Sequence, residues 1–379
     1  MKRKIGYLPV LITASIFIIQ GCKKYESPPE CGGKTVTVTT QKVLVTGLND
    51  PRGLKFGPDG NLYVAEAGIG GTNLSTTCAQ VVAPVGPYLG SDTGSRISMI
   101  DRNGIRTTVA DKLPSSITAP GGGSGIQGVA DVAFVGNTLY GLLAGAGCSH
   151  GVPDIPNGVV KVHPDKTWSM VANLSEFIMA NPVAHPNPAD FEPDGTWFGM
   201  INSGGILYAI EPNHGEVDKV TPGGNISRLI DVSAYEGHIV PTCIVNHDGN
   251  FYVGNLDLFP IVQGSASVYK ITPQGQISVY ASGFETVLGV AFDADNRLYV
   301  LECTAGQDAL TPGFGDIVRV DPSGQKTVIA SGFHLPSAMT FGPDGSLYVS
   351  DWGIGPPGMG QIVQVSFKCE NVQPDTKSY

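Results

Sequence analysis

The chain has 379 residues, a formal net charge of -10 and a pI near 5.1. Its 23 lysines and arginines form no basic stripe that would neutralise phosphates, which excludes nucleic acid as a partner. With 51 glycines and 28 prolines beside 41% apolar residues, the composition excludes a disordered chain and is typical of many short strands joined by turns.

The first 21 residues have the pattern of a signal peptide. Lys2, Arg3 and Lys4 form a basic start, an apolar stretch follows over residues 5–19, and Gly21 directly precedes Cys22. This pattern predicts a lipoprotein signal that is removed, so that Cys22 becomes an acylated N-terminus and residues 22–34 a tether. The alternative is an ordinary signal peptide followed by a coincidental cysteine. Lysines directly after Cys22 favour the outer membrane of a bacterial cell envelope, with no other membrane contact than the lipid.

From residue 48 onward one unit recurs six times: a short apolar strand, a tight turn, a second strand and a second hairpin. The second strands contain Leu-Tyr-Val at 62–64, 298–300 and 347–349, Phe-Tyr-Val at 251–253, and Leu-Tyr at 139–140 and 207–208. Turn signals precede most of them, although Pro-Asp-Gly at 193–195 is displaced in the third copy. Four strands per unit are typical of propeller blades, so the sequence predicts an all-β, six-bladed β-propeller.

The sixth copy stops after its third strand, and a strand for its outer edge is available at the other end of the chain. Residues 35–45 alternate valine and threonine, as a half-buried strand does. Pairing of the two ends predicts a ring closed by the N-terminal strand, with the propeller over residues 35–369 and a tail over 370–379. The competing interpretation is a pair of β-sandwiches.

Six cysteines remain after Cys22, and an oxidising envelope favours their pairing. Cys31 precedes the N-terminal strand and Cys369 follows the last strand of copy six, so antiparallel pairing brings them to one end of the sheet. Cys78 and Cys148 follow the second strands of adjacent copies, and we place Cys243 and Cys303 on loops of copies four and five. The predicted bridges are Cys31–Cys369, Cys78–Cys148 and Cys243–Cys303; the alternative for each is a pair of buried free thiols.

Nearly all the long connections should emerge on one face of the ring, which we call the loop face; the opposite side, with the tight hairpins, is the hairpin face. The long loops are expected at residues 67–95, 111–128, 145–157, 174–194, 303–315 and 352–360. Long loops on a rigid scaffold are where binding and catalytic groups tend to lie.

At the end of the second strand, equivalent positions of the six copies hold mainly oxygen-bearing side chains. They are Glu66, Leu143, Glu211, Asn255, Glu302 and Asp351. Convergence of the five polar residues on the channel mouth would suit a divalent cation such as Ca²⁺, or would supply acid and base for hydrolysis. The alternative is that each caps its own loop or faces solvent. His150, His214 and His238 lie on nearby loops and are candidates to join such a site.

Several segments resemble the ScyD/ScyE family. They are Leu-Asn-Asp-Pro-Arg-Gly-Leu at 48–54, the run 57–68, and the segments 128–134 and 145–148. That family is similar to NHL-repeat propellers and is often secreted or lipid-anchored. Arg52 in the first segment joins the ligand-binding candidates. More remotely, the carboxylate set looks like that of gluconolactonase and regucalcin propellers, which hold a divalent metal at the channel mouth.

The sequence therefore supports two main functions. The first is a binding protein that presents its loop face to a small molecule, a glycan or a protein partner. The second is a metal-dependent hydrolase or lactonase built on the five polar residues at the second-strand ends. A structural role in the envelope is the third.

Overall fold

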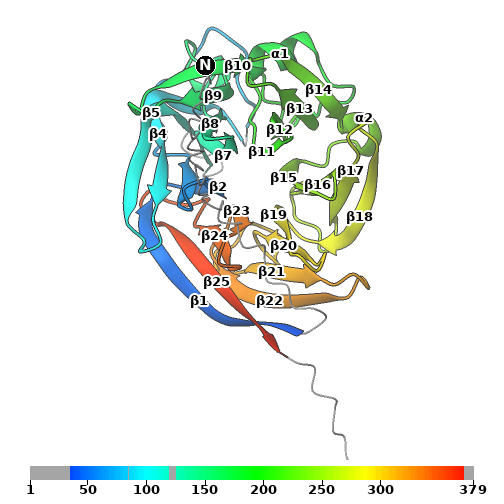
Figure 1. Cartoon of the computed structure of the whole chain (residues 1–379). Helices are drawn as coiled ribbons and strands as arrows, with labels where there is room; N and C mark the ends of the chain where they lie inside the picture. Colours follow the sequence, from blue (N-terminus) through cyan, green and yellow to red (C-terminus); the bar gives the residue numbers. More distant parts are fainter. Residues whose placement is uncertain (1–34, 84, 119–124, 371–379) are drawn as a thin grey trace, which may run out of the picture.

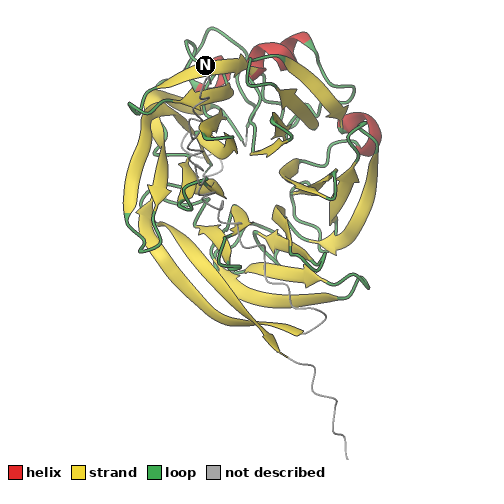
Figure 2. Ribbon diagram, viewed as in Figure 1, coloured by secondary structure: helices red, strands yellow, loops and turns green. Residues whose placement is uncertain are grey.

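The computed structural model describes residues 35–83, 85–118 and 125–370. They form a ring of six antiparallel sheets around a central channel, with the first strand of each sheet nearest the channel (Figure 1). The predicted six-bladed β-propeller is confirmed. Almost all regular structure is strand, and the helices lie at the periphery (Figure 2).

The first three blades take up residues 51–231. Blade 1 contains β2 (Pro51–Phe56), β3 (Leu62–Glu66), β4 (Tyr88–Ile100), β5 (Arg106–Thr118) and the short β6 (Ile126–Gln127). Blade 2 contains β7 (Val129–Val135), β8 (Thr138–Leu143), β9 (Gly158–Val162) and β10 (Trp168–Asn173). Blade 3 contains β11 (Gly199–Ser203), β12 (Ile206–Glu211), β13 (Glu216–Val220) and β14 (Ile226–Asp231).

The other three blades complete the ring. Blade 4 contains β15 (Pro241–His247), β16 (Asn250–Asn255), β17 (Ala266–Ile271) and β18 (Ile277–Phe284). Blade 5 contains β19 (Val287–Phe292), β20 (Leu298–Glu302), β21 (Gly315–Val320) and β22 (Lys326–Phe333). Blade 6 contains β23 (Ala338–Phe341), β24 (Leu347–Asp351), β25 (Gly360–Glu370) and β1 (Thr35–Leu48). The helices are η1 (Cys148–His150), α1 (Leu174–Ala180) and α2 (Ser233–Glu236).

The ring is closed by the N-terminal strand, as the alternating pattern of residues 35–45 predicts. β1 pairs antiparallel with β25 from Thr35 opposite Glu370 to Leu48 opposite Gly360, and the two long strands lie side by side in Figure 1. Leu48 is fully buried against Leu54 and Ile100 of blade 1. The closure therefore contributes side chains to the core as well as hydrogen bonds to the edge of blade 6.

The core consists of layers between neighbouring blades. In the described chain, six apolar clusters each combine side chains from two adjacent blades, one cluster for every blade interface. The tyrosine of the recurring Leu-Tyr-Val pattern contacts a phenylalanine of the next blade: Tyr63 meets Phe134 edge-on at 4.9 Å, and Tyr299 meets Phe341 at 5.2 Å between ring centroids. The repeat is thus a packing unit that one blade cannot satisfy alone.

The tyrosines of this pattern also form hydrogen bonds with the turn that precedes their strand. In the Pro-Asp-Gly turns, the Tyr63 hydroxyl donates to Asp59 at 3.0 Å and the Tyr348 hydroxyl donates to Asp344 at 3.1 Å. Gly60 takes the positive φ of 78° that ends the first of these turns and that a side chain would disfavour. In blade 3 the hairpin turns instead at Gly204 and Gly205, so Pro-Asp-Gly at 193–195 lies outside it.

Blade 1 departs from the expected loops. The sequence predicts loops over residues 67–95 and 111–128, whereas β4 begins at Tyr88 and β5 continues to Thr118. These extensions pair with each other, with Tyr88 opposite Thr118 and Ser91 opposite Ser115, and β6 adds to their edge. The expected loops are therefore in part a hairpin that stands above blade 1 on the loop face.

Candidate functional site

The five polar residues at the second-strand ends are buried, and each is bound within its own blade. Glu66 accepts a hydrogen bond from the Asn49 N–H at 2.9 Å, Glu302 accepts from the Glu285 N–H at 2.7 Å, and Asp351 accepts from the His334 N–H at 2.6 Å. In each pair the donor lies 17 residues upstream, just before the first strand of the blade. The same bond therefore recurs in blades 1, 5 and 6.

The cause is the conformation of the crossover between blades. The residue that follows each donor has a positive φ, 49° at Asp50, 42° at Thr286 and 46° at Leu335, which turns the chain sharply into its first strand. The preceding N–H then points into the blade and needs an acceptor, because a buried unpaired donor is costly. A carboxylate at the end of the second strand supplies that acceptor.

In blades 4 and 3, Asn255 and Glu211 also form hydrogen bonds with nearby backbone groups. Asn255 accepts from the Ser267 N–H at 2.7 Å and donates to the Ile239 carbonyl at 3.0 Å, while Glu211 accepts from the N–H groups of Thr196 and His214. Among the described residues, no group of three or more His, Cys, Asp or Glu is placed to hold a metal ion. Each residue of the predicted set Glu66, Glu211, Asn255, Glu302 and Asp351 is therefore engaged by hydrogen-bond partners of its own.

Burial raises the pKa of several of these acids. For Glu302 it raises the pKa to about 7, and the pKa values of Glu211 and Asp351 move in the same direction. Glu66 also lies next to two guanidinium groups: Arg106 forms an ion pair with it at 2.6 Å and Arg96 approaches it at 3.2 Å. Blade 1 thus adds two arginines to the crossover amide that also binds the carboxylate in blades 5 and 6.

Arg52 lies where β2 starts, on the loop side of the channel, and is only 5% exposed. Its Nη2 donates to the Ile126 carbonyl at 2.6 Å, and its guanidinium lies 5.6 Å from the centroid of the Phe198 ring. Asp50 next to it accepts from the Gly355 N–H at 3.0 Å, and burial raises the pKa of Asp50 to about 7. Arg52 therefore ties blade 1 to neighbouring loops and has little surface to offer a ligand.

His150 is at the centre of a buried polar network between blades 1, 2 and 3. Its Nδ1 lies 2.9 Å from the Ser116 hydroxyl, and its Nε2 lies 3.2 Å from Glu192 and 3.3 Å from the Thr196 hydroxyl. The ring stacks on Tyr88 at 4.5 Å between centroids. The contacts from Ser116 to His150 and from His150 to Glu192 resemble those of a nucleophile, its base and a carboxylate. Ser116 and His150 are both fully buried, however, so no substrate could reach them. In this state the trio holds loops together.

His214 joins the same network. The ring Nε2 of His214 lies 2.8 Å from the Glu192 carbonyl oxygen, and the backbone N–H of His214 donates to the Glu211 carboxylate. The structure thus brings His150, His214 and Glu211 together, although Glu192 was not anticipated. His238 pairs at 2.7 Å with Asp190, which lies in the same connection between blades 2 and 3 that carries Glu192. No sequence pattern singles out Glu192, because the expected loop over residues 174–194 contains four acidic residues.

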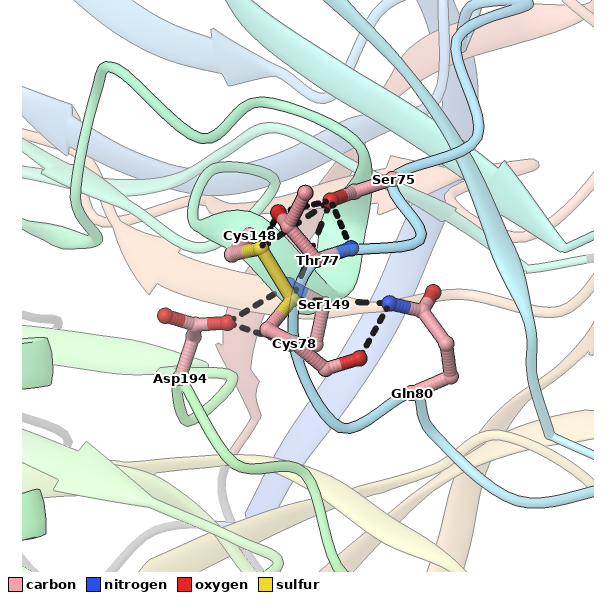
Figure 3. Close-up of a disulfide and its surroundings, with 7 residues drawn as sticks. All are labelled: Ser75, Thr77, Cys78, Gln80, Cys148, Ser149 and Asp194. Carbon is pink, nitrogen blue, oxygen red and sulfur yellow. Dashed lines mark hydrogen bonds between the residues drawn. A yellow bond between two sulfur atoms is a disulfide. The ribbon is translucent and has the colours of Figure 1, made fainter.

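The predicted bridge Cys78–Cys148 is present and joins the loops after the second strands of blades 1 and 2 (Figure 3). Next to it, the N–H and the hydroxyl of Ser149 both donate to Asp194, at 2.7 and 2.6 Å. Three loops from three blades therefore meet at this point. A disulfide also indicates an oxidising, extracytoplasmic location. None of the described helices is long and apolar enough to cross a membrane.

The predicted bridge Cys243–Cys303 is wrong, because both residues are free thiols. Cys243 lies in β15 and not in a loop, and its side chain packs with the cluster between blades 4 and 5. Cys303 packs with Leu288 and Leu335 in a separate cluster. Cys369 is disulfide-bonded, but its expected partner Cys31 lies outside the described residues, as do Cys22 and the predicted signal peptide and tether.

Loss of the Cys78–Cys148 bridge should loosen the loop face. We expect the double substitution Cys78→Ser and Cys148→Ser to lower the free energy of unfolding by about 2–4 kcal/mol, because it frees a loop of the unfolded chain. Thermal melting measures the loss, and limited proteolysis should show new cleavage within residues 67–87. Thr77→Ala, an exposed change beside the bridge, is the control. Equal melting of the double variant and the control would contradict this expectation.

The sequence matches no family model and no curated protein. Among solved structures, a protein of unknown function from Bacteroides thetaiotaomicron is similar with a TM-score of 0.54 at 12% identity, over 88% of this chain and 76% of that one. A gluconolactonase from Xanthomonas campestris is similar with a TM-score of 0.53 at 10% identity, over 90% and 97%. The PQQ-bound aldose sugar dehydrogenase from Streptomyces coelicolor has a TM-score of 0.52 at 14% identity, over 90% and 100%.

These likenesses show the fold alone. Six-bladed propellers of this kind include a lactonase and a sugar dehydrogenase, so the fold is compatible with several chemistries. The function of this chain has to be argued from its own side chains.

Proposed function

We propose that the protein is an extracytoplasmic binding protein, held at the outer membrane by a lipid on Cys22, whose loop face binds a protein partner. The observation that supports this most directly is the distribution of exposed apolar side chains. Eight large ones stand on the connections that follow the second strands of blades 1, 4, 5 and 6: Ile69, Leu74, Val82, Leu258, Phe259, Val262, Phe314 and Met359. Apolar and aromatic anchors of this kind form the centres of protein interfaces.

The loops that carry them are well supported. The Ile261 N–H donates to the Asp308 carbonyl at 3.2 Å, which ties the loop after β16 to the loop after β20. Beneath them lies an apolar cluster with Leu288, Cys303 and Leu335 at its centre. Phe259 is 56% exposed and Val262 is 61% exposed on top of this support. A preformed surface loses little conformational entropy when it binds.

The buried groups favour binding over hydrolysis. The acids that would have to supply metal ligands or a general base accept hydrogen bonds from crossover amides, and the histidines His150 and His214 hold loops. A Ca²⁺ site or a lactonase site would need these groups to leave their partners. The likeness to the ScyD/ScyE family is part of this proposal, because members of that family are often secreted or lipid-anchored.

Site-specific cross-linking tests the proposal. A photoreactive amino acid at Phe259 should give one discrete protein adduct in cells that make the full-length protein. The same probe at Tyr280, which is similarly exposed but lies on the outer strand β18, is the matched control and should give none. Equal labelling from both positions, or none from Phe259, would contradict a partner at the loop face.

A further inference from the structure

The channel also has an open end on the hairpin face, with a cavity of about 450 Å³. All six blades contribute the ends of their first strands to its wall, and these strands surround the ring centre in Figure 1. Phenylalanines from four blades, Phe56, Phe134, Phe292 and Phe341, form part of it. The size is in the range of sites for small molecules.

A second, smaller cavity of about 30 Å³ lies deeper in the channel. The residues that separate the two cavities form the floor of the larger one. The residues that line both are Lys55, Val245, Val290 and Met339. Lys55 therefore stands at the bottom of the larger cavity, among apolar side chains. Of the described residues that line the larger cavity, it is the only Lys, Arg, Asp or Glu.

Lys55 is incompletely engaged by its protein neighbour. Its Nζ lies 3.6 Å from Asp131 Oδ2, which is longer than an ordinary N–H···O bond. Asp131 is buried and accepts from the N–H groups of Val132 and Met200, each at 2.8 Å. The carboxylate thus has backbone donors of its own. The ammonium has three donors and a side chain that is 29% exposed, so it retains capacity for a further acceptor.

The other ionisable side chain in the wall is already engaged. His247 stacks on Phe292 at 4.0 Å between ring centroids, and its Nε2 lies 2.9 Å from Asn296. It therefore extends the aromatic wall. The cavity therefore has one ammonium group at its base and mainly apolar and amide side chains in its wall. It is complementary to a ligand that has one negative charge and an apolar remainder.

We propose that this cavity binds a small organic acid, with its carboxylate at Lys55 Nζ and its apolar part against Val290, Met339 and the phenylalanine rings. A charge-assisted hydrogen bond in a largely apolar cavity is stronger than the same bond in water. The site lies at the opposite end of the channel from the loop face, so it does not depend on the proposed protein partner. Failure of either proposal leaves the other intact.

Calorimetric titration with octanoate and with 1-octanol tests the charge requirement, because the two probes have the same chain length. In the full mature protein at about pH 7, octanoate should bind saturably and 1-octanol about tenfold more weakly. Lys55→Met should weaken octanoate binding about tenfold or more and leave 1-octanol unchanged, whereas Lys55→Arg should retain octanoate. Lys161→Met, which removes an exposed lysine on β9, is the matched control.

A second variant protects the test against misfolding. Val245→Phe fills the floor of the cavity without a change in charge and should abolish binding of both probes. If Lys55→Met does not fold, the comparison of octanoate with 1-octanol on the unaltered protein and on Val245→Phe still decides. Three results would overturn the proposal: equal affinity of the unaltered protein for the two probes, unchanged octanoate binding by Lys55→Met or by Val245→Phe, or no octanoate binding by the unaltered protein at about 5 mM.

Discussion

A chain that begins after Leu48 should not fold. β1 supplies the outer edge of blade 6 and pairs with β25 along its whole length. Val36 and Leu48 are buried, and Val38 packs against the cluster between blades 5 and 6. Burial of each such side chain contributes about 1.5–3 kcal/mol, so loss of the strand approaches the whole stability of about 5–15 kcal/mol. The exposed edge of β25 would also favour aggregation.

Circular dichroism and thermal melting of the soluble fraction measure this effect. We expect the truncated chain to be insoluble or to show no cooperative transition, and Leu48→Asp to lose much of the stability that the full chain has. Gln41→Asp makes the same change in charge at an exposed position of the same strand and should melt like the unaltered protein. A cooperative transition in the truncated chain would show that the ring closes without β1.

The fold was predictable because its signals are local. Alternation over residues 35–45, the Leu-Tyr-Val pattern and the Asp-Gly turns each report on a few neighbouring residues. Once one blade is recognised, the others follow by repetition. The bridge Cys78–Cys148 was predictable for a related reason, because both cysteines lie in the connections after the second strands of adjacent blades.

The site was less predictable because its geometry depends on segments far apart in sequence. The equivalence of Glu66, Glu302 and Asp351 was visible, but their orientation toward amides 17 residues upstream depends on the positive φ of the crossover residue. An acid repeated at the end of the second strand can face the channel as a metal ligand or accept a hydrogen bond from the crossover backbone. The strand pattern in the sequence is the same in both cases. The capping alternative is the one that the structure supports.

The network around His150 illustrates the same limit. Ser116 and Tyr88 reach it only because β4 and β5 extend above blade 1, and Glu192 reaches it from the crossover between blades 2 and 3. No periodic pattern marks these contacts. Cys243 and Cys303 failed as a pair for a related reason, since Cys243 occupies a strand position that the sequence placed in a loop.

Buried acids should make the protein more stable in mild acid than in mild alkali. Burial raises the pKa of Asp50 and of Glu302 to about 7, well above the value of about 4 expected in the unfolded chain. The folded state therefore keeps protons that the unfolded state loses between about pH 4 and 7. The resulting stabilisation is fully present below the unfolded pKa, falls as the pH rises, and is lost above the folded pKa.

A further pair adds to this effect. Glu216 and Asp218 on β13 are both buried, and burial raises the pKa of both; the charge of Glu216 raises the pKa of Asp218 further. Arg228 pairs with Glu216 and opposes the rise. The net direction for the pair is the same as for Asp50 and Glu302, so all four acids lower the stability of the fold as the pH rises.

The double substitution Asp50→Asn and Glu302→Gln isolates the effect. Both amides keep an oxygen that can accept the Gly355 and Glu285 N–H groups, and asparagine tolerates the positive φ of 49° at residue 50. We expect the double variant to be more stable than the unaltered protein at about pH 8, by on the order of 3 kcal/mol for each site, and the two to converge near pH 4. Chemical unfolding across this pH range measures the difference.

Asp248→Asn is the matched control, because Asp248 also has a positive φ, 46°, but its side chain is 76% exposed. Its substitution should not alter how stability depends on pH, since it removes no buried carboxyl. If the double variant gains nothing over the control at about pH 8, burial does not raise the pKa of Asp50 and Glu302 in the folded protein. The hydrogen bonds that Asp50 and Glu302 accept from the Gly355 and Glu285 N–H groups would then be charge-assisted at neutral pH, which offsets the cost of burying the two charges.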